Sequence, residues 1–235
     1  MIGIIAALDA ELALLRGKLA DENIRTLSGT NYYTGTLAGQ GVVLAVCGVG
    51  KVNAALCAQT MCLLWQPTLI INTGVAGALA AGLHVGDVVI GTAAVQHDMD
   101  VTDIGVGDPP GLLLFGGERW VELPCDAFTT KRLTQIAEAN GARVLPGVVA
   151  TGDQFIHDSA RKAWIVETFG AACCEMEGGA IAHVCAANAV PCAIVRAISD
   201  NADDGAAGDF LEFLPIAAQN GAGIVEEYLR SRGQT

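Results

Sequence analysis

The chain has 235 residues, of which 13 are basic and 25 acidic, so its formal net charge is −12. Charged residues make up only 16% and hydrophobic residues 52%, which excludes a disordered chain because so much apolar surface has to be buried. The negative charge argues against nucleic acid or an anionic membrane surface as a partner.

The first half of the sequence alternates strand and helix patterns. A buried strand is expected at Ile2–Ala7 and a helix from Asp9 to Leu19. The stretch Val52–Gly86 has no charged residue, yet its amides, proline and glycines favour a buried α/β core over a membrane span. A hairpin is expected from Asn31–Leu37 and Gly41–Cys47, followed by a helix at Val52–Trp65. Two buried strands are then expected at Thr68–Asn72 and Asp87–Ala94, around a glycine-rich turn.

The second half begins with His97–Pro124, which is expected to be a long loop because glycine and proline recur in it. Four helices are expected at Asp126–Asn140, Ser159–Thr168, Gly178–Asn188 and Phe210–Arg230, with strands near Val144–Thr151 and Pro191–Ser199. No linker interrupts the alternation. This pattern predicts a single α/β domain over residues 1–235, with helices on both faces of a sheet.

The cysteines and histidines suggest no metal. Eight cysteines lie mostly in apolar runs without a CxxC pair, which favours small buried side chains in a reducing cytoplasm over disulfides or structural zinc. The segment His97-Asp-Met-Asp100 offers too few ligands for a convincing metal site, and no cofactor is expected. The N-terminus lacks the basic region of a signal peptide.

Gly48-Val-Gly-Lys51 has the look of a nucleotide-binding loop but fails both common patterns. A P-loop would need glycine at Ala45 and Ser or Thr at Val52, and a dinucleotide fingerprint would need glycine at Asn53. Such a turn either brings the backbone close to a ligand or simply packs a strand against a helix.

Acidic residues follow apolar segments at three places. Glu11 follows the first strand, Glu175 and Glu177 precede a helix, and Asp200 ends the strand that is most clearly predicted to be buried. Ligands bind at the carboxyl ends of strands in α/β sheets, and burial there can raise a carboxyl pKa enough to retain a proton. Each acid has an alternative structural role at a helix start or turn. Arg196 is the expected counter-charge for Asp200.

Eight spaced motifs, taken together, are specific. They are Ile2–Glu11, Gly48–Asn53, Asn72–Gly77, Val85–Val89, His97–Thr102, Thr151–Ile156, Glu175–Glu177 and Val195–Asp200. With them the chain resembles the bacterial 5′-methylthioadenosine/S-adenosylhomocysteine nucleosidases of the purine nucleoside phosphorylase-like superfamily. The resemblance implies a three-layer α/β sandwich with a central mixed, partly barrel-like β-sheet flanked by helices.

The implied reaction is hydrolysis of the N-glycosidic bond of methylthioadenosine and adenosylhomocysteine, and of 5′-deoxyadenosine, in methionine salvage and methyl-cycle recycling. By this resemblance Asp200 protonates adenine N7 with help from Ser199, and Glu11 activates water with help from Arg196 and Glu175. The implied substrate-binding residues are Leu8, Val75, Ile104, Phe155, Ile156, Glu175, Met176, Glu177, Arg196, Ser199 and Phe210.

The resemblance also implies how the substrate lies. Glu177 binds the ribose hydroxyls while Met176 packs on the sugar, and Phe155 stacks on adenine beside the backbone of Ile156. Leu8 and Phe210 line the 5′-alkylthio pocket.

Ile104 is implied to reach that pocket from a second subunit. The apolar residues of the loop, namely Ile104, Val106, Leu112, Leu113, Leu114 and Phe115, predict a homodimer with a shared site. The alternative is a lid on the same subunit. Val75 and Ile104 depart from the serine and aromatic residue usual in the family.

Three other functions are alternatives to the implied nucleosidase. A phosphorylase needs cations around its phosphate, but Asn72 and Val75 stand where related phosphorylases have arginine and serine. A futalosine-type nucleosidase is excluded less firmly. A catalytically inactive nucleoside-binding protein is disfavoured by the retained acids Glu11, Glu177 and Asp200.

Overall fold

The computed structural model describes residues 1–104 and 108–233, so Val106 of the expected loop lies outside the described residues. The strands are β1 (Ile2–Ala6), β2 (Ala20–Leu27), β3 (Thr30–Leu37), β4 (Gln40–Val46), β5 (Leu69–Ala78), β6 (Val88–Gln96), β7 (Leu113–Phe115), β8 (Glu118–Trp120), β9 (Leu123–Pro124), β10 (Val144–Thr151), β11 (Ala171–Glu175) and β12 (Cys192–Asp200). The helices are α1 (Asp9–Arg16), α2 (Lys51–Trp65), α3 (Ala127–Ala139), α4 (Ser159–Phe169), α5 (Gly178–Ala187) and α6 (Ala206–Arg232).

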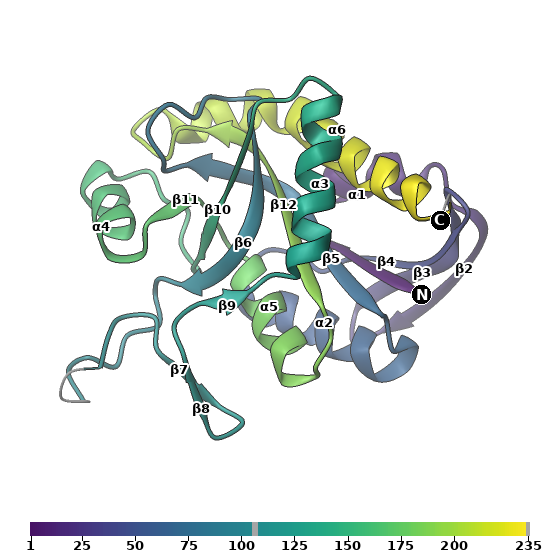
Figure 1. Cartoon of the computed structure of the whole chain (residues 1–235), viewed down its shortest axis with the longest axis horizontal. Helices are drawn as coiled ribbons and strands as arrows, with labels where there is room; N and C mark the ends of the chain where they lie inside the picture. Colours follow the sequence, from purple (N-terminus) through teal and green to yellow (C-terminus); the bar gives the residue numbers. More distant parts are fainter. Residues whose placement is uncertain (105–107, 234–235) are drawn as a thin grey trace.

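The main sheet is mixed and partly closed (Figure 1). Its strands follow the order β11-β10-β6-β12-β5-β1-β4-β3-β2, with β9 alongside β6. β11 also pairs antiparallel with β5, where Cys174 lies opposite Gly77. This pairing joins five of the strands into a ring, which is the partly barrel-like sheet that the resemblance implied.

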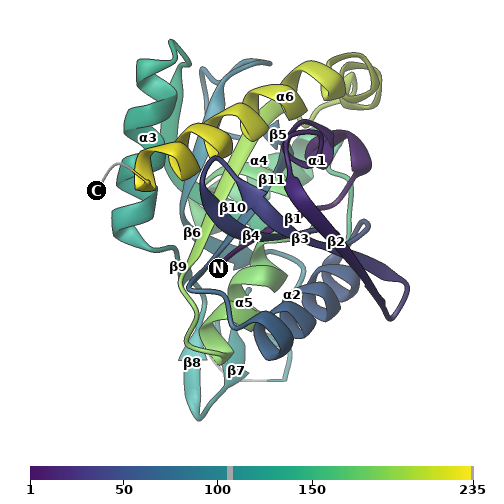
Figure 2. The same ribbon diagram turned by 90° about the vertical axis from the view of Figure 1, so that its right-hand side faces the viewer.

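Helices cover both faces of this sheet (Figure 2). On one face α2 and α5 pack together and bury side chains such as Met61 and Ile181 in one core cluster. On the other face α1, α3 and α6 bury Leu15, Leu133 and Leu229 in a second cluster. The expected α/β sandwich with helices on both faces is confirmed.

Several element boundaries follow from local chemistry. The side chains of Asp126 and Asp158 cap α3 and α4 by accepting hydrogen bonds from backbone N–H groups at 2.8 and 2.6 Å. Helix α4 ends at Gly170, whose φ of 61° is left-handed, a conformation that glycine adopts without strain. These signals explain why most of the helices lie within a few residues of their predicted positions.

Three expectations about secondary structure were wrong. β2 was missed, because its side chains are exposed along most of its length and it has no apolar face. β5 continues through Gly74 and Gly77 to Ala78, where a glycine-rich turn was expected after Asn72. The segment His97–Pro124 is not all loop, since β7 and β8 form a hairpin around Gly116 and Gly117 that projects from the body (Figure 1).

All eight cysteines are free and buried, as their apolar sequence context predicted. None of the helices in the described part of the chain combines the length and apolar character that crossing a membrane requires.

Candidate active site

A cavity of about 180 Å³ lies at the carboxyl ends of β1, β5 and β12. These strands run parallel, so their ends meet at one edge of the sheet, and β11 ends beside them. The cavity is lined by Ala7, Leu8, Glu11, Val49, Val75, Ala76, Gly77, Phe155, Cys174, Glu175, Met176, Glu177, Ser199, Asp200 and Phe210.

Most residues predicted for the site line this cavity, and three do not. Ile156 lines a smaller adjoining cavity together with Phe155 and Asp200. Arg196 is fully buried and reaches the site through its contact with Glu175. Ile104 is 87% exposed and is absent from the cavity wall of its own chain.

Glu11 is held by backbone groups from two elements. It lies in the first turn of α1 and is 2% exposed. Its Oε2 accepts hydrogen bonds from the N–H groups of Ala7 and Leu8, each at 2.9 Å, and its Oε1 accepts one from Val75 N–H at 3.0 Å. Burial raises the pKa of Glu11, against the opposing effects of the Arg196 charge and these hydrogen bonds. The site therefore contains a fixed carboxylate with enhanced basicity.

Arg196 pairs with Glu175, so the expectation that it is the counter-charge of Asp200 was wrong. Its Nη2 donates to Glu175 Oε2 and to Asn72 Oδ1, and its Nη1 donates to Val75 O at 3.4 Å. β12 carries a bulge between residues 198 and 200, and Arg196 and Asp200 have separate hydrogen-bond partners. The positive charge of the Arg196 guanidinium therefore offsets the negative charge of Glu175 behind the cavity.

Glu175 is saturated with donors. Besides Arg196, its Oε2 accepts from the N–H groups of Glu177 and Gly178 at 3.0 and 2.7 Å, and its Oε1 accepts from the Thr151 hydroxyl. These donors come from four different residues and fix the position of the Glu175 carboxyl group. Its geometry suits an anchor better than a proton carrier.

Glu177 directly precedes α5 and is 4% exposed. Its Oε1 accepts a hydrogen bond from Gly50 N–H at 2.9 Å, so the glycine turn before α2 approaches this wall of the site. Gly50 has a φ of 98°, which requires glycine. Burial and the charge of Glu175 raise the pKa of Glu177 to about 7.

Asp200 is the last residue of β12 and is 2% exposed. Its Oδ2 accepts a hydrogen bond from the Ser199 hydroxyl at 2.9 Å, and its Oδ1 accepts one from Ala202 N–H at 2.9 Å. Burial raises the pKa of Asp200 despite these two bonds. The pKa of Asp200 is therefore shifted in the direction that a proton donor requires.

Aromatic side chains close one side of the cavity. The rings of Phe155 and Phe210 meet edge to face, with centroids 5.8 Å apart and planes inclined at 77°. Leu8, Val49 and Met176 add apolar surface to the same cavity. A mostly apolar pocket with a few converging carboxylates is suited to a flat heterocycle attached to a polar sugar.

Five lining residues were not predicted: Ala7, Val49, Ala76, Gly77 and Cys174. Val49 and Gly77 lie inside the motifs Gly48–Asn53 and Asn72–Gly77, so these motifs could have indicated that both residues belong to the site. A Cβ on Gly77 would lie 2.8 Å from Asp200 Oδ1, which explains the glycine. Cys174 reaches the site through the β11–β5 pairing, which no local pattern reveals.

The two aspartates of the His97–Asp100 segment are engaged in other contacts. Asp98 accepts from Lys51 Nζ at 2.6 Å, and Asp100 accepts from Thr102 N–H at 2.9 Å. Over residues 1–104 and 108–233, no group of three or more His, Cys, Asp or Glu side chains is arranged to hold a metal ion.

Comparison with known proteins agrees with this geometry. A family model described as the phosphorylase superfamily matches residues 1–230. The 5′-methylthioadenosine/S-adenosylhomocysteine nucleosidase of Anoxybacillus flavithermus is 39% identical over 233 residues, covering 96% of each chain.

Solved structures of related proteins also superimpose on this chain. The nucleosidase of the same name from Neisseria meningitidis, in complex with methylthio-immucillin-A, superimposes with a TM-score of 0.92 at 37% identity over 98% of each chain. Futalosine hydrolase of Helicobacter pylori also matches, with a TM-score of 0.91 at 29% identity over 98% of this chain and 97% of that one. The chain therefore belongs to the phosphorylase superfamily and, within it, to the 5′-methylthioadenosine/S-adenosylhomocysteine nucleosidase family.

Proposed function

We propose that the protein hydrolyses the N-glycosidic bond of 5′-methylthioadenosine and S-adenosylhomocysteine, releasing adenine and the corresponding 5-thioribose. The observation that carries this proposal is the presence of two buried carboxyl groups with raised pKa values around one cavity, Glu11 in the first turn of α1 and Asp200 at the end of β12. Hydrolysis needs a base for water and an acid for the leaving base, and this pair can supply both.

Asp200 acts on the adenine. Its carboxyl proton is transferred to N7 while the bond between N9 and C1′ breaks, so adenine leaves as a neutral molecule. The ribose becomes oxocarbenium-like as that bond lengthens. Ser199 fixes the orientation of the carboxyl group through its 2.9 Å hydrogen bond.

Glu11 acts on the water. Its carboxylate takes one proton as the water oxygen forms a bond to C1′, and proton transfer through solvent then restores protonated Asp200 and ionised Glu11. The nearby Arg196–Glu175 pair helps Glu11, since the Arg196 charge favours the ionised form of Glu11.

The other lining residues position the substrate. Glu177 accepts hydrogen bonds from the 2′ and 3′ hydroxyls, and Met176 packs against the sugar. Phe155 stacks on adenine, whose edge meets the backbone of Ile156. Leu8 and Phe210 surround the 5′-alkylthio group, and Val75 supplies an apolar contact close to Glu11.

The active form is a homodimer in which Ile104 of the partner subunit completes the 5′ pocket. Support comes from Ile104, which is exposed and does not line the cavity of its own chain, and from an exposed apolar row along α2 formed by Val52, Leu56 and Leu63. Leu112 and Leu113 do not contribute, because both are buried in their own chain. These two residues therefore give no support to the prediction of a homodimer from the apolar residues of the loop. The eight free cysteines support a reducing, cytoplasmic setting.

Phosphorolysis finds no support at the site. None of the described residues that line the cavity is lysine or arginine. Arg196 is committed to Glu175 and Asn72 behind the cavity. A phosphate nucleophile would therefore lack the cations that its binding requires.

The test is to incubate the purified protein with methylthioadenosine and to measure free adenine by chromatography, with and without phosphate. Adenine release at the same rate in both conditions supports the proposal, and release only with phosphate contradicts it. Because futalosine hydrolase is among the structural matches, futalosine is the second substrate to assay. A higher kcat/KM on futalosine than on methylthioadenosine would replace the proposed substrate.

A further inference from the structure

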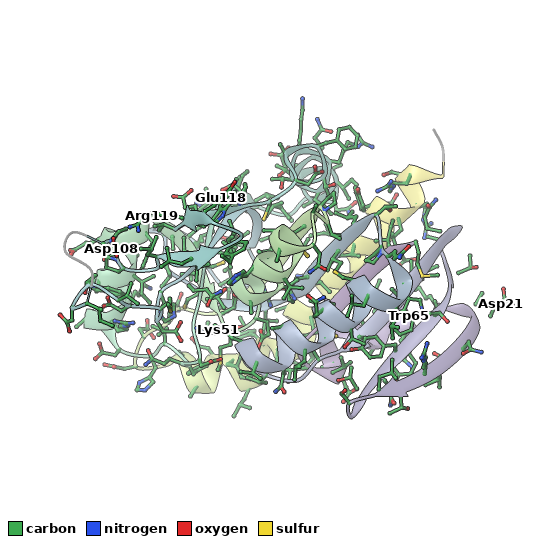
Figure 3. All side chains as sticks on the ribbon, turned by 90° about the horizontal axis from the view of Figure 1, so that it is seen from below. Asp21, Lys51, Trp65, Asp108, Glu118 and Arg119 are labelled. Carbon is green, nitrogen blue, oxygen red and sulfur yellow. The ribbon has the colours of Figure 1, made fainter. Side chains whose placement is uncertain are left out.

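Three charged residues outside the cavity wall form a closed ring of hydrogen bonds through their side chains and backbone N–H groups. Lys51 N–H donates to Asp153 Oδ1 at 2.7 Å, and Asp153 N–H donates to Asp98 Oδ2 at 2.9 Å. Asp98 Oδ1 closes the ring by accepting from Lys51 Nζ at 2.6 Å. Figure 3 shows Lys51 and Trp65 near opposite ends of α2, so the ring lies at the N-terminal end of this helix.

The ring joins segments that are distant in sequence. Lys51 begins α2, Asp98 follows β6 and Asp153 follows β10. The Lys51 ammonium also donates to Gln96 Oε1 at 3.2 Å, at the end of β6. Burial raises the pKa of Asp98, but the hydrogen bonds that Asp98 accepts and the charge of Lys51 lower it by more. The pKa of Asp98 therefore lies below its ordinary value. The Asp98 carboxylate is thus ionised across the neutral pH range.

Two members of the ring, Lys51 and Asp153, are each connected to one wall of the cavity. On the sugar side, Gly50 is adjacent to Lys51 and donates its N–H to Glu177 Oε1 at 2.9 Å. On the base side, Asp153 lies two residues before Phe155, in a segment whose Gly152 N–H is held by Glu175 O at 3.2 Å. A Cβ on Gly50 would lie 3.0 Å from Asp153 Oδ1, so the two segments are in close contact.

We propose that Lys51, Asp98 and Asp153 are positioning residues that fix the sugar-binding carboxylate of Glu177 relative to the base-stacking ring of Phe155. The inference rests on the proposed function, because that function assigns the sugar to Glu177 and the base to Phe155. A nucleoside occupies both walls at once and its glycosidic bond spans the gap between them. Free adenine occupies only one wall. Breaking the ring therefore weakens the binding of a nucleoside much more than the binding of adenine.

The experiment compares two probes by isothermal titration calorimetry on the full chain. The nucleoside probe is methylthio-immucillin-A, the analogue bound in the Neisseria meningitidis structure, and the base probe is adenine. The variants are Lys51→Met, Asp98→Asn and the double substitution. The matched control is Lys18→Met, which breaks another 2.6 Å ion pair, with Glu226 and away from the cavity.

We expect each single ring variant to weaken methylthio-immucillin-A binding at least tenfold and adenine binding less than threefold. The double variant should be no more than about threefold worse than the single variants, because residues that act as one unit are not additive. Lys18→Met should leave the binding of both probes unchanged. The inference is overturned if both probes lose affinity equally or if the ring variants bind both like the wild type.

The same samples separate the two proposals. If the wild type releases no adenine from methylthioadenosine, the proposed function fails while the ratio of the two affinities still decides the role of the ring. If the wild type hydrolyses methylthioadenosine and the ratio does not change in the variants, only the positioning role is overturned. If the wild type binds neither probe, both proposals are overturned.

Discussion

The Oε1 atom of Glu11 accepts a hydrogen bond from the backbone N–H of Val75 at 3.0 Å, although 64 residues separate the two in sequence. This bond ties the first turn of α1 to the middle of β5. The side chain that we propose as the base is thus positioned by a backbone group of the central sheet as well as by the backbone groups that precede its own helix.

Gly74→Ala should disrupt this arrangement. A Cβ at position 74 would lie 2.6 Å from Glu11 Oε1 and would also contact Arg196 Nη1. Overpacking of this kind costs about 1–3 kcal/mol of stability, and misplacing the base by about 1 Å can cost roughly 100-fold in rate. Denaturant unfolding and steady-state kinetics measure the two effects. The control is Gly41→Ala, whose Cβ meets nothing within 4 Å. Equal kinetics in the two variants would contradict the account of Glu11.

Glu11→Gln and Asp200→Asn should each lower kcat by about 10²–10⁴-fold, the usual cost of removing a general acid or base. Binding of methylthio-immucillin-A should survive in both, because the cavity keeps its shape. Kinetics on methylthioadenosine and calorimetry together test this. An Asp200→Asn variant with nearly wild-type turnover would rule out protonation of the leaving base by this residue.

Glu177 should make stability depend on pH. Its pKa rises from an ordinary value of 4.5 to about 7 in the folded state, so between these values the folded chain binds a proton that the unfolded chain has lost. The free energy of unfolding therefore falls as the pH rises through this window, by about 3 kcal/mol in all for this group.

Glu177→Gln removes that dependence. The variant should gain stability over the wild type as the pH goes from about 5 to 8, and the gain should vanish toward pH 4. Urea denaturation at a series of pH values measures the difference. A difference that is independent of pH, or that shrinks as the pH rises, would contradict the assigned pKa.

Ile104→Asp tests the shared site. A charge beside the alkylthio tail should raise KM for methylthioadenosine roughly tenfold while changing the melting temperature little. Ile24→Asp is the control, since Ile24 is also exposed, on the edge strand β2. Sedimentation that shows a fully active monomer at assay concentration would refute the proposed dimer.

The parts of the fold that the sequence predicts well are those with a local signal. The apolar run of β12 ends at Asp200, and aspartates cap α3 and α4 where these helices were expected. β2 has no comparable signal because its residues are mostly polar and exposed. It is held in place by its pairing with β3, which is a tertiary contact.

The glycines of β5 show why part of the site could not be predicted. Read locally, Gly74 and Gly77 indicate a turn, but both lie within a strand. They are glycines because Glu11, Arg196 and Asp200 occupy the space that a Cβ would need. The pairing of Arg196 with Glu175 likewise depends on β11 lying against β5, which spacing along the chain does not reveal.

The central claim is that water attacks the sugar of an adenine thionucleoside. It is tested most directly by turnover of methylthioadenosine in H₂¹⁸O containing phosphate, followed by mass spectrometry of the sugar product. The account predicts adenine together with 5-methylthioribose that carries one ¹⁸O atom, at a rate that does not depend on phosphate. Formation of unlabelled 5-methylthioribose 1-phosphate, in an amount equal to the adenine released, would contradict it.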